Sequence, residues 1–185
     1  MTEGVWETPL GKVTIDRDLA NKIYRSSNII DIDEEAHLHE HSLEVQLPFL
    51  QYLYQQKVKI VPLCLMMQDL ETSREVGDAI ARSIKNSNTV IIASTDMSHY
   101  EPHETAVRKD RKAIEAILAM QDEELHRIIR SENISMCGYG AVTALIRAAS
   151  ILDTYNTTLL SYHTSGEVTE DYHAVVGYAS IKLSK

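Results

Sequence analysis

Two short apolar runs in the first half of the chain have the pattern of buried strands. Residues 58–66 and 89–94 are rich in valine, isoleucine and leucine and carry little charge. Such runs are typical of strands buried on both faces of a parallel sheet. The intervening residues 71–86 have helical spacing of apolar side chains, at Val76, Ala79, Ile80 and Ile84. The order strand, helix, strand predicts a βαβ crossover.

The second half of the chain continues the alternation of helices and strands. Residues 108–120 and 140–152 repeat apolar side chains every three or four positions, which predicts two helices that cover the sheet. Residues 157–162 and 174–183 follow as two predicted strands, separated by the polar turn at residues 164–167. We expect these strands to close the sheet as an edge of mixed direction.

Residues 41–54 also have helical spacing, but Pro48 interrupts them. Proline lacks the backbone N–H and clashes with the preceding turn, so a kink or a break is expected there. No internal repeat, low-complexity tract or flexible linker divides residues 1–185. We therefore expect one α/β domain with a mostly parallel sheet flanked by helices.

Composition narrows the class of partner. The net charge is −9 and the pI is about 5.3, so the long-range field opposes binding to phosphate backbones. The apolar stretches fall short of the roughly 20 residues that a membrane helix needs. The first residues show no secretory signal, and two cysteines fit a reducing compartment. We expect a cytoplasmic protein without a nucleic-acid or membrane partner.

Asp96 and His99 directly follow the second predicted strand. Ligands of open α/β sheets bind beyond the carboxyl ends of strands, so both side chains are expected in such a crevice. A carboxylate three residues before a histidine can orient the imidazole as a general acid or base. The alternative is structural, with Asp96 capping a helix and His99 packed as an ordinary polar residue.

Three histidines alternate along the chain at His37, His39 and His41. On an extended strand their rings would share one side, as metal chelation requires, and a zinc hydrolase could be built on them. If a helix begins near Glu40, that geometry fails. Then only His41 and Glu44 share a face, and the other two histidines are loop residues exposed to solvent.

The two cysteines have different sequence surroundings. Cys137 precedes Gly138 at a predicted helix start, where free backbone amides favour a reactive or metal-bound thiolate. The alternative is a buried, inert cysteine. Cys64 lies within the first apolar run, where a small buried thiol without chemistry is expected.

Five segments of the chain form an ordered set of motifs: Glu3 to Gly11, Glu40 to Leu50, Asp96 to Tyr100, Ser135 to Gly140 and Val176 to Ser180. Together they resemble the Memo family, in which they occur in the same order. The resemblance covers nearly the whole chain, which is similar to the archaeal and bacterial members called AmmeMemoRadiSam system protein B. It implies an α/β sandwich like that of class III extradiol dioxygenases, although a shared fold does not establish a shared activity.

The resemblance also implies a metal site. Its ligands would be His41 of the Glu-His-Ser motif, Cys137 of the Cys-Gly motif and an earlier histidine, with Asp96 and His99 lining the same pocket as acid/base groups. The earlier histidine belongs to a segment that precedes the motif beginning at Glu3, and this sequence does not contain it. We therefore expect weaker metal binding, and an unpaired sheet edge that favours dimers.

Three functions follow as expectations. The first is a metal-binding protein with redox or oxygenase-like chemistry, for which a thiolate ligand makes iron or copper the leading metals and zinc an alternative. The second is a non-catalytic module that binds a peptide or small molecule in the same pocket. The third, with least support, is the zinc hydrolase. The family name also implies a functional link to radical S-adenosylmethionine and AMMECR-type proteins.

Overall fold

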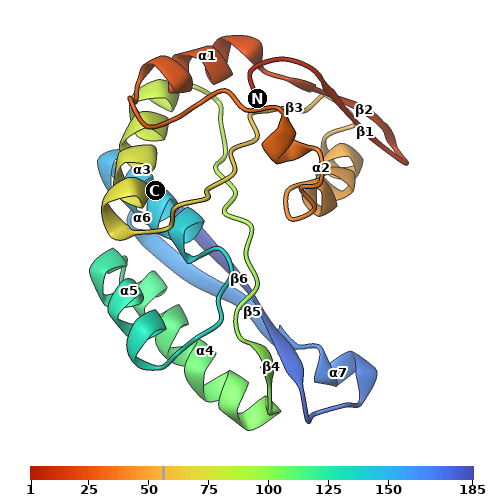
Figure 1. Ribbon diagram of the computed structural model, residues 1–185, viewed down its shortest axis with the longest axis vertical. Helices are drawn as coiled ribbons and strands as arrows, with labels where there is room; N and C mark the ends of the chain where they lie inside the picture. The colour runs from red at the N-terminus through yellow and green to blue at the C-terminus, as the bar shows by residue number, and fades with distance from the viewer. Residues whose placement is uncertain (56) are drawn as a thin grey trace.

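A computed structural model describes residues 1–55 and 57–185 (Figure 1). Helices and strands alternate along the described chain, with two short 3-10 turns before the second helix. In chain order the elements are β1 (Val5–Thr8), β2 (Gly11–Ile15), α1 (Arg17–Arg25), η1 (Glu35–His37), η2 (Glu44–Gln46), α2 (Leu47–Tyr54), β3 (Lys59–Ile60), α3 (Leu70–Ile84), β4 (His99–Glu101), α4 (His103–Leu118), α5 (Asp122–Ser131), α6 (Tyr139–Ile151), β5 (Asn156–Thr164), α7 (Gly166–Thr169) and β6 (Val175–Ser184).

The strands form two separate three-stranded sheets. The first has the order β1-β2-β3, in which β1 and β2 form an antiparallel hairpin and β3 adds a short parallel pairing. The second has the order β4-β6-β5 and is antiparallel throughout. The expectation of a mostly parallel sheet was therefore wrong for this chain, whereas the mixed α/β class is confirmed. The tail strands pair with each other because a short connection favours antiparallel neighbours.

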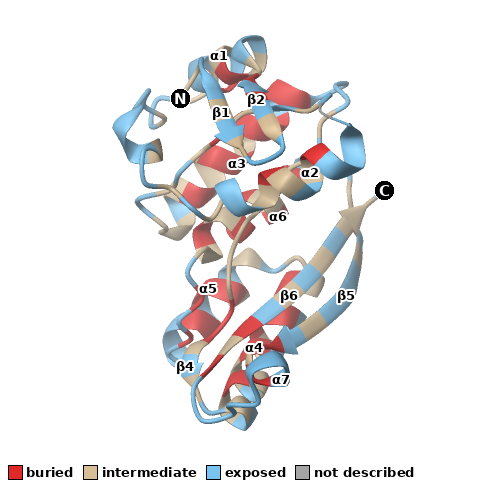
Figure 2. Ribbon diagram, turned by 90° about the vertical axis from the view of Figure 1, so that its right-hand side faces the viewer, coloured by how far each residue is buried: buried red, intermediate tan, exposed pale blue. Residues whose placement is uncertain are grey.

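Two groups of buried side chains stabilise the molecule (Figure 2). One joins α4, α5 and α6 to the second sheet and includes Met97, Ile114, Leu125 and Ile146. The other joins α1, α3 and α6 and includes Ile23, Ile80 and Ala144. In Figure 2 the buried residues concentrate on the inner helices, whereas much of β5 is exposed.

The helices α3 and α6 approach each other closely at Gly77. A Cβ at this position would lie 2.6 Å from the carbonyl oxygen of Ala144, so only glycine fits without displacing a helix. The sequence predicted both helices, and their observed bounds lie within three residues of the expected ones at every end. They form a rigid pair beneath the candidate site.

The two predicted parallel strands are extended but largely unpaired. Only Lys59–Ile60 of the first run forms a strand, and residues 89–94 form none. Their inward side chains, including Leu63 and Ile91, pack on the α1–α3–α6 core. Their outward side chains are exposed, with Met66 at 93% and Val90 at 78%. Burial on one face is confirmed, and burial on both faces was wrong.

The predicted helix at residues 41–54 is shorter than expected. A 3-10 turn precedes it, and α2 begins at Leu47 with Pro48 in its first turn. Proline is tolerated there because the first turn has no intrahelical partner for its missing N–H. Pro48 therefore starts a helix and does not kink one. Among the described residues, no helix has the length and apolarity to cross a membrane.

Candidate functional site

Asp96, His99 and Cys137 converge at one place. Each offers one ligand atom, and these atoms all lie within 4.8 Å of one another. Within residues 1–55 and 57–185, no other group of three or more histidine, cysteine or acidic side chains is this close. The ligand atoms around a tetrahedral zinc lie roughly 3.4 Å apart, given bonds of about 2.0–2.3 Å, so small side-chain rotations would bring the three atoms to a metal.

Ser135 fixes the orientation of the His99 ring. The backbone N–H of His99 donates to Ser135 Oγ at 2.7 Å, and His99 Nδ1 lies 2.8 Å from the Ser135 carbonyl oxygen. A carbonyl oxygen only accepts, so Nδ1 carries the proton and Nε2 has the free lone pair. Nε2 lies 3.6 Å from Asp96 Oδ2. A histidine held in this way presents Nε2 ready to bind a metal or a proton.

Cys137 is placed beside Asp96 by a tight contact between two segments. The Asp96 N–H donates to Cys137 Sγ at 3.2 Å, and the Gly138 N–H donates to Thr95 Oγ1 at 2.8 Å. A Cβ at Gly138 would lie 2.7 Å from the Ser94 carbonyl oxygen, so the glycine permits this approach. The Cys-Gly pair therefore needs its glycine for geometry.

Gln68 supports the other side of the same turn. Its Nε2 donates to the Cys137 carbonyl oxygen at 2.9 Å, and its Oε1 accepts from the Gly140 N–H at 2.8 Å. The support from Gln68 and Ser135 was not predicted. For Gln68 the available signal was its position after the first apolar run, whereas Ser135 begins the matching segment that contains Cys137.

A buried network holds the chain between Asp96 and His99. The Met97 N–H donates to the Gly177 carbonyl oxygen, and the Gly177 N–H donates to the Ser98 carbonyl oxygen, both at 2.9 Å. Asp110 accepts from the Ser98 N–H at 2.9 Å and lies fully buried on α4. The site segment is thus fixed to β6 and to α4.

His41 lies in a neighbouring loop but outside the group of three. The loop contacts the site segment, because Ser94 Oγ donates to the Ser42 carbonyl oxygen at 2.7 Å and Gln46 Nε2 donates to Ser94 Oγ at 3.1 Å. The His41 side chain is exposed. Partial burial opposes ionisation of Glu40, but hydrogen bonds from Ser42, Leu43 and Glu44 outweigh it and lower its pKa.

Of the two alternatives for His37, His39 and His41, the extended strand is wrong. His37 ends the 3-10 turn η1, and the backbone turns again before His41, so the three rings do not share one extended face. His37 instead contacts Trp6 edge-on and places Nδ1 2.9 Å from the Asp33 carbonyl oxygen. This geometry removes the basis for the zinc hydrolase.

The surroundings of the two thiols also differ from expectation in one respect. Cys137 precedes the N-cap of α6, as predicted, and it is exposed. Cys64 is exposed as well, because the outward face of its run has no cover, so the expectation of a buried thiol was wrong. Partial desolvation, followed by repulsion from Glu40, raises the pKa of Cys64 and makes its thiolate scarcer.

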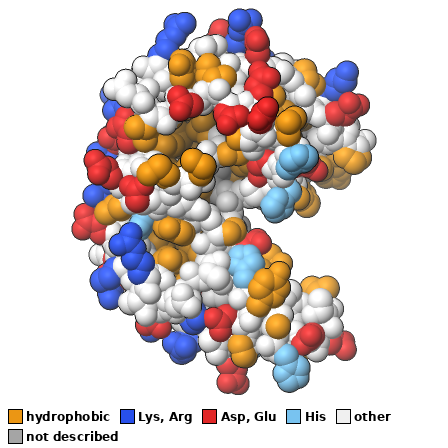
Figure 3. All heavy atoms as spheres, viewed as in Figure 1, with side chains coloured by type: hydrophobic (Ala, Val, Ile, Leu, Met, Phe, Trp, Pro, Cys, Tyr) orange, Lys and Arg blue, Asp and Glu red, His pale blue; other side chains and the backbone are white. Residues whose placement is uncertain are grey.

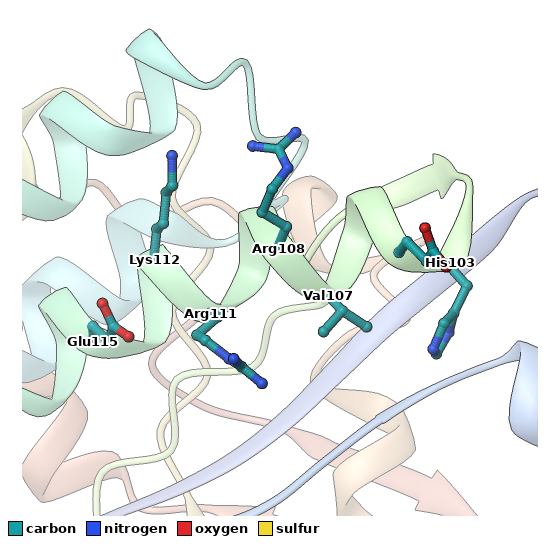
Figure 4. Close-up of a pocket in the computed structure, with 7 residues that line it drawn as sticks. His103, Val107, Arg108, Arg111, Lys112 and Glu115 are labelled. Atoms are coloured by element: carbon teal, nitrogen blue, oxygen red, sulfur yellow. The ribbon is translucent and has the colours of Figure 1, made fainter.

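Two hollows are visible on the surface. Figure 3 shows a hollow between the part that carries α2 and the part that carries β4 and α7, with hydrophobic and histidine side chains on its walls. A second, shallow pocket runs along α4 (Figure 4). Two of its cations, Arg108 and Lys112, are paired with Glu132, which reduces the local positive field. The second pocket does not contain the Asp96–His99–Cys137 group.

Comparison with known proteins identifies the family. A family model described as "Memo-like protein" matches residues 1–182. The chain belongs to the Memo family. A MEMO1 family protein of Methanococcus maripaludis is 50% identical over 184 residues, which cover 97% of this chain and 65% of that protein. One from Methanopyrus kandleri is 49% identical over 183 residues, with 98% and 65% covered.

A third relative shows the same coverage. The MEMO1 family protein of Methanocaldococcus jannaschii is 50% identical over 183 residues, which cover 96% of this chain and 64% of that protein. The chain thus spans just under two thirds of the length of the Memo proteins it matches. The family predicted from the five motifs is confirmed.

Proposed function

We propose that the Asp96–His99–Cys137 group binds a transition metal and that this chain is a metal-dependent member of the Memo family. The observation that carries the proposal is the convergence of a carboxylate, an imidazole and a thiol within 4.8 Å from two separate segments. The oriented His99 ring and the exposed Cys137 sulfur support it. The mixed donor set suits iron or copper, with zinc as the alternative.

The protein's own residues prepare the site for such a metal. Ser135 holds His99 with Nε2 facing Asp96, and the Asp96 N–H stabilises negative charge on Cys137. When bound, iron or copper would supply redox or oxygenase-like chemistry, and zinc would supply Lewis acidity. Asp96 is half exposed, so a small molecule or peptide could approach from solvent. Without a metal, the Asp96–His99 pair would act as an acid/base couple.

The proposal shares one ligand with the set that the family resemblance implies and differs in the other two. Cys137 is common to both, but His99 and Asp96 lie beside it where the resemblance expects His41. His41 is on a loop that contacts Ser94, so a movement of this loop could add it as a further ligand. The dioxygenase-like sandwich and the functional link to radical S-adenosylmethionine and AMMECR-type proteins remain predictions.

Metal affinity in single variants tests the proposal. We expect Cys137→Ser and His99→Gln each to weaken binding of Co(II), Zn(II) and Cu(I) by at least about 10- to 100-fold, measured by competition with a chelator. Cys64→Ser is the matched control and should bind as the wild type does. His41→Gln distinguishes the two ligand sets. Unchanged affinity in both Cys137→Ser and His99→Gln would refute the proposal.

A second candidate function is a peptide-binding module without catalysis. The helix α2 begins directly after the loop that contacts Ser94, and it exposes Phe49, Tyr52 and Leu53 at 69–81%. Exposed aromatic side chains of this kind are common at peptide-binding surfaces. Peptide binding that is unchanged by chelator and by Cys137→Ser, but lost in Tyr52→Ser, would favour this function over the first.

A further inference from the structure

The turn that carries Asp96 and His99 lies on a buried carboxylate. Asp110 has 0% of its surface exposed, and its two oxygens accept hydrogen bonds from the Ser98 N–H at 2.9 Å and the Tyr162 hydroxyl at 2.8 Å. Both donors are neutral. A buried carboxylate costs free energy that an apolar side chain of similar size would avoid, so its presence suggests a task other than stability.

Gly177 leaves space for this carboxylate, and Tyr162 binds it. A Cβ at Gly177 would lie 2.0 Å from Asp110 Oδ2, so any side chain there would displace the carboxylate. The Gly177 backbone is also hydrogen-bonded to Met97 and Ser98, the two residues between Asp96 and His99. Tyr162 comes from β5, and burial, together with its bond to Asp110, raises the pKa of its hydroxyl, which therefore stays a donor.

We propose that Asp110, with Tyr162 and Gly177 around it, is a positioning residue that sets the separation of Asp96 and His99 and thereby the metal affinity of the site. Ser98 is the residue next to His99, so a shift of its N–H moves the His99 backbone directly. Ser135 fixes the His99 ring from the other side. The turn is thus held by α4 and β6 beneath and by the segment before Cys137 above.

This inference rests on the proposed metal site, and Co(II) is the probe that tests it. We expect Asp110→Leu and Gly177→Ala to weaken Co(II) binding by about 10- to 100-fold and to shift the visible Co(II) spectrum, because ligand geometry changes. Asp110→Asn keeps an acceptor for the Ser98 N–H and should restore affinity to within a few fold. Val13→Ala is the control for lost stability, since Val13 is 2% exposed on β2 in the other sheet.

A second measurement needs no metal. The Asp96 N–H donates to Cys137 Sγ, so a displaced turn should change the rate of Cys137 thiol labelling relative to Cys64 by several fold. Tyr162→Phe, the mildest change, covers the case in which the stronger variants fail to fold. If the folded variants keep the wild-type labelling ratio and Co(II) spectrum, Asp110 is structural and the inference is wrong. If wild-type protein binds no Co(II), the proposed function fails, while the labelling ratio still decides the role of Asp110.

Discussion

The β5–β6 hairpin and the extended segments at 61–66 and 89–95 all contain strand-forming residue types but have different surroundings. The hairpin pairs along nearly its whole length, from Asn156↔Ser184 to Thr164↔Gly177. In the two extended segments, no hydrogen bond joins the backbone to the backbone of any other described residue. Apolar and β-branched composition makes all of them suitable for a sheet.

The difference shows what composition does and does not determine. Alternating apolar side chains place one face of each extended segment on the core, whether or not a neighbouring strand is present. A ladder of hydrogen bonds between strands requires a second backbone at about 4.8 Å, and the composition of a segment does not determine whether one is present. Segments 61–66 and 89–95 therefore have the side-chain burial of a sheet without its hydrogen bonds, and they offer an edge to other chains.

Hydrogen exchange should reveal the largest difference between the two regions. We expect the amides of His163 and Tyr178, which face each other in the hairpin, to exchange at least about 1,000-fold more slowly than those of Leu63 and Ile92. Exchange measured by NMR at low protein concentration checks this. Equal protection would mean that the extended segments are paired in solution and that the comparison fails.

Truncation of side chains should give the next largest effect. Ile114 is 4% exposed beneath the second sheet, so Ile114→Ala should reduce the free energy of unfolding by about 2–5 kcal/mol. Val90 is 78% exposed, so Val90→Ala should change it by less than about 0.5 kcal/mol. Urea unfolding of both variants measures the contrast. A large loss in Val90→Ala would show that the outward face is covered in solution.

A charge introduced into the extended segments should have a smaller effect, on self-association. If the open segments pair with a second copy, a charge on their outward face should weaken dimers by about 10-fold or more. Ile92→Lys places that charge on residues 89–95, whereas Val168→Lys on α7 is the control at another exposed position, with Ile92 45% and Val168 86% exposed. Sedimentation over a concentration series distinguishes the two. If Val168→Lys weakens association as much as Ile92→Lys does, the effect comes from the added charge alone and not from the extended segments.

The smallest effect concerns the pH dependence of stability, through a histidine between α5 and α6 in the core beneath the hairpin. His126 is 4% exposed and bonds Thr143, and burial followed by repulsion from Arg130 lowers its pKa. The unfolded chain then binds a proton more readily, so stability is full above about pH 6.5 and falls as the pH drops below it. The slope for one group cannot exceed about 1.4 kcal/mol per pH unit. His126→Gln should remove this slope, and a persistent slope would assign it to another group.

The sequence predicted the elements whose structure depends on their own side chains. The helix α3 and the hairpin strands followed from periodicity, and α6 followed from its apolar face and the preceding glycine. The roles expected for Asp96 and His99 stay predictions, and the structure adds that both lie beside Cys137. Periodicity within a segment indicates which face is buried, and it does so correctly for α3, where Val76, Ala79, Ile80 and Ile84 are all buried.

What the sequence could not predict are contacts between distant segments. Whether residues 61–66 pair with another strand depends on the position of other backbone segments. The hydrogen bond from Gln68 to Cys137 likewise joins positions far apart in the chain. The loop at residues 30–46 was equally hard to predict. Its short 3-10 turns lack the length over which apolar spacing becomes informative, so the arrangement of His37 and His41 could not be derived.

The close contact at Gly77 makes the candidate site sensitive to a distant methyl group. Gln68 lies just before α3 and Cys137 just before α6, and Gly77 fixes the distance between these two helices. A side chain at position 77 would push α3 and α6 apart. Because both helices are closely packed, this shift would lengthen the hydrogen bond between Gln68 and the Cys137 carbonyl oxygen. The distance between α3 and α6 in the core thus determines the distance between Gln68 and Cys137 at the surface.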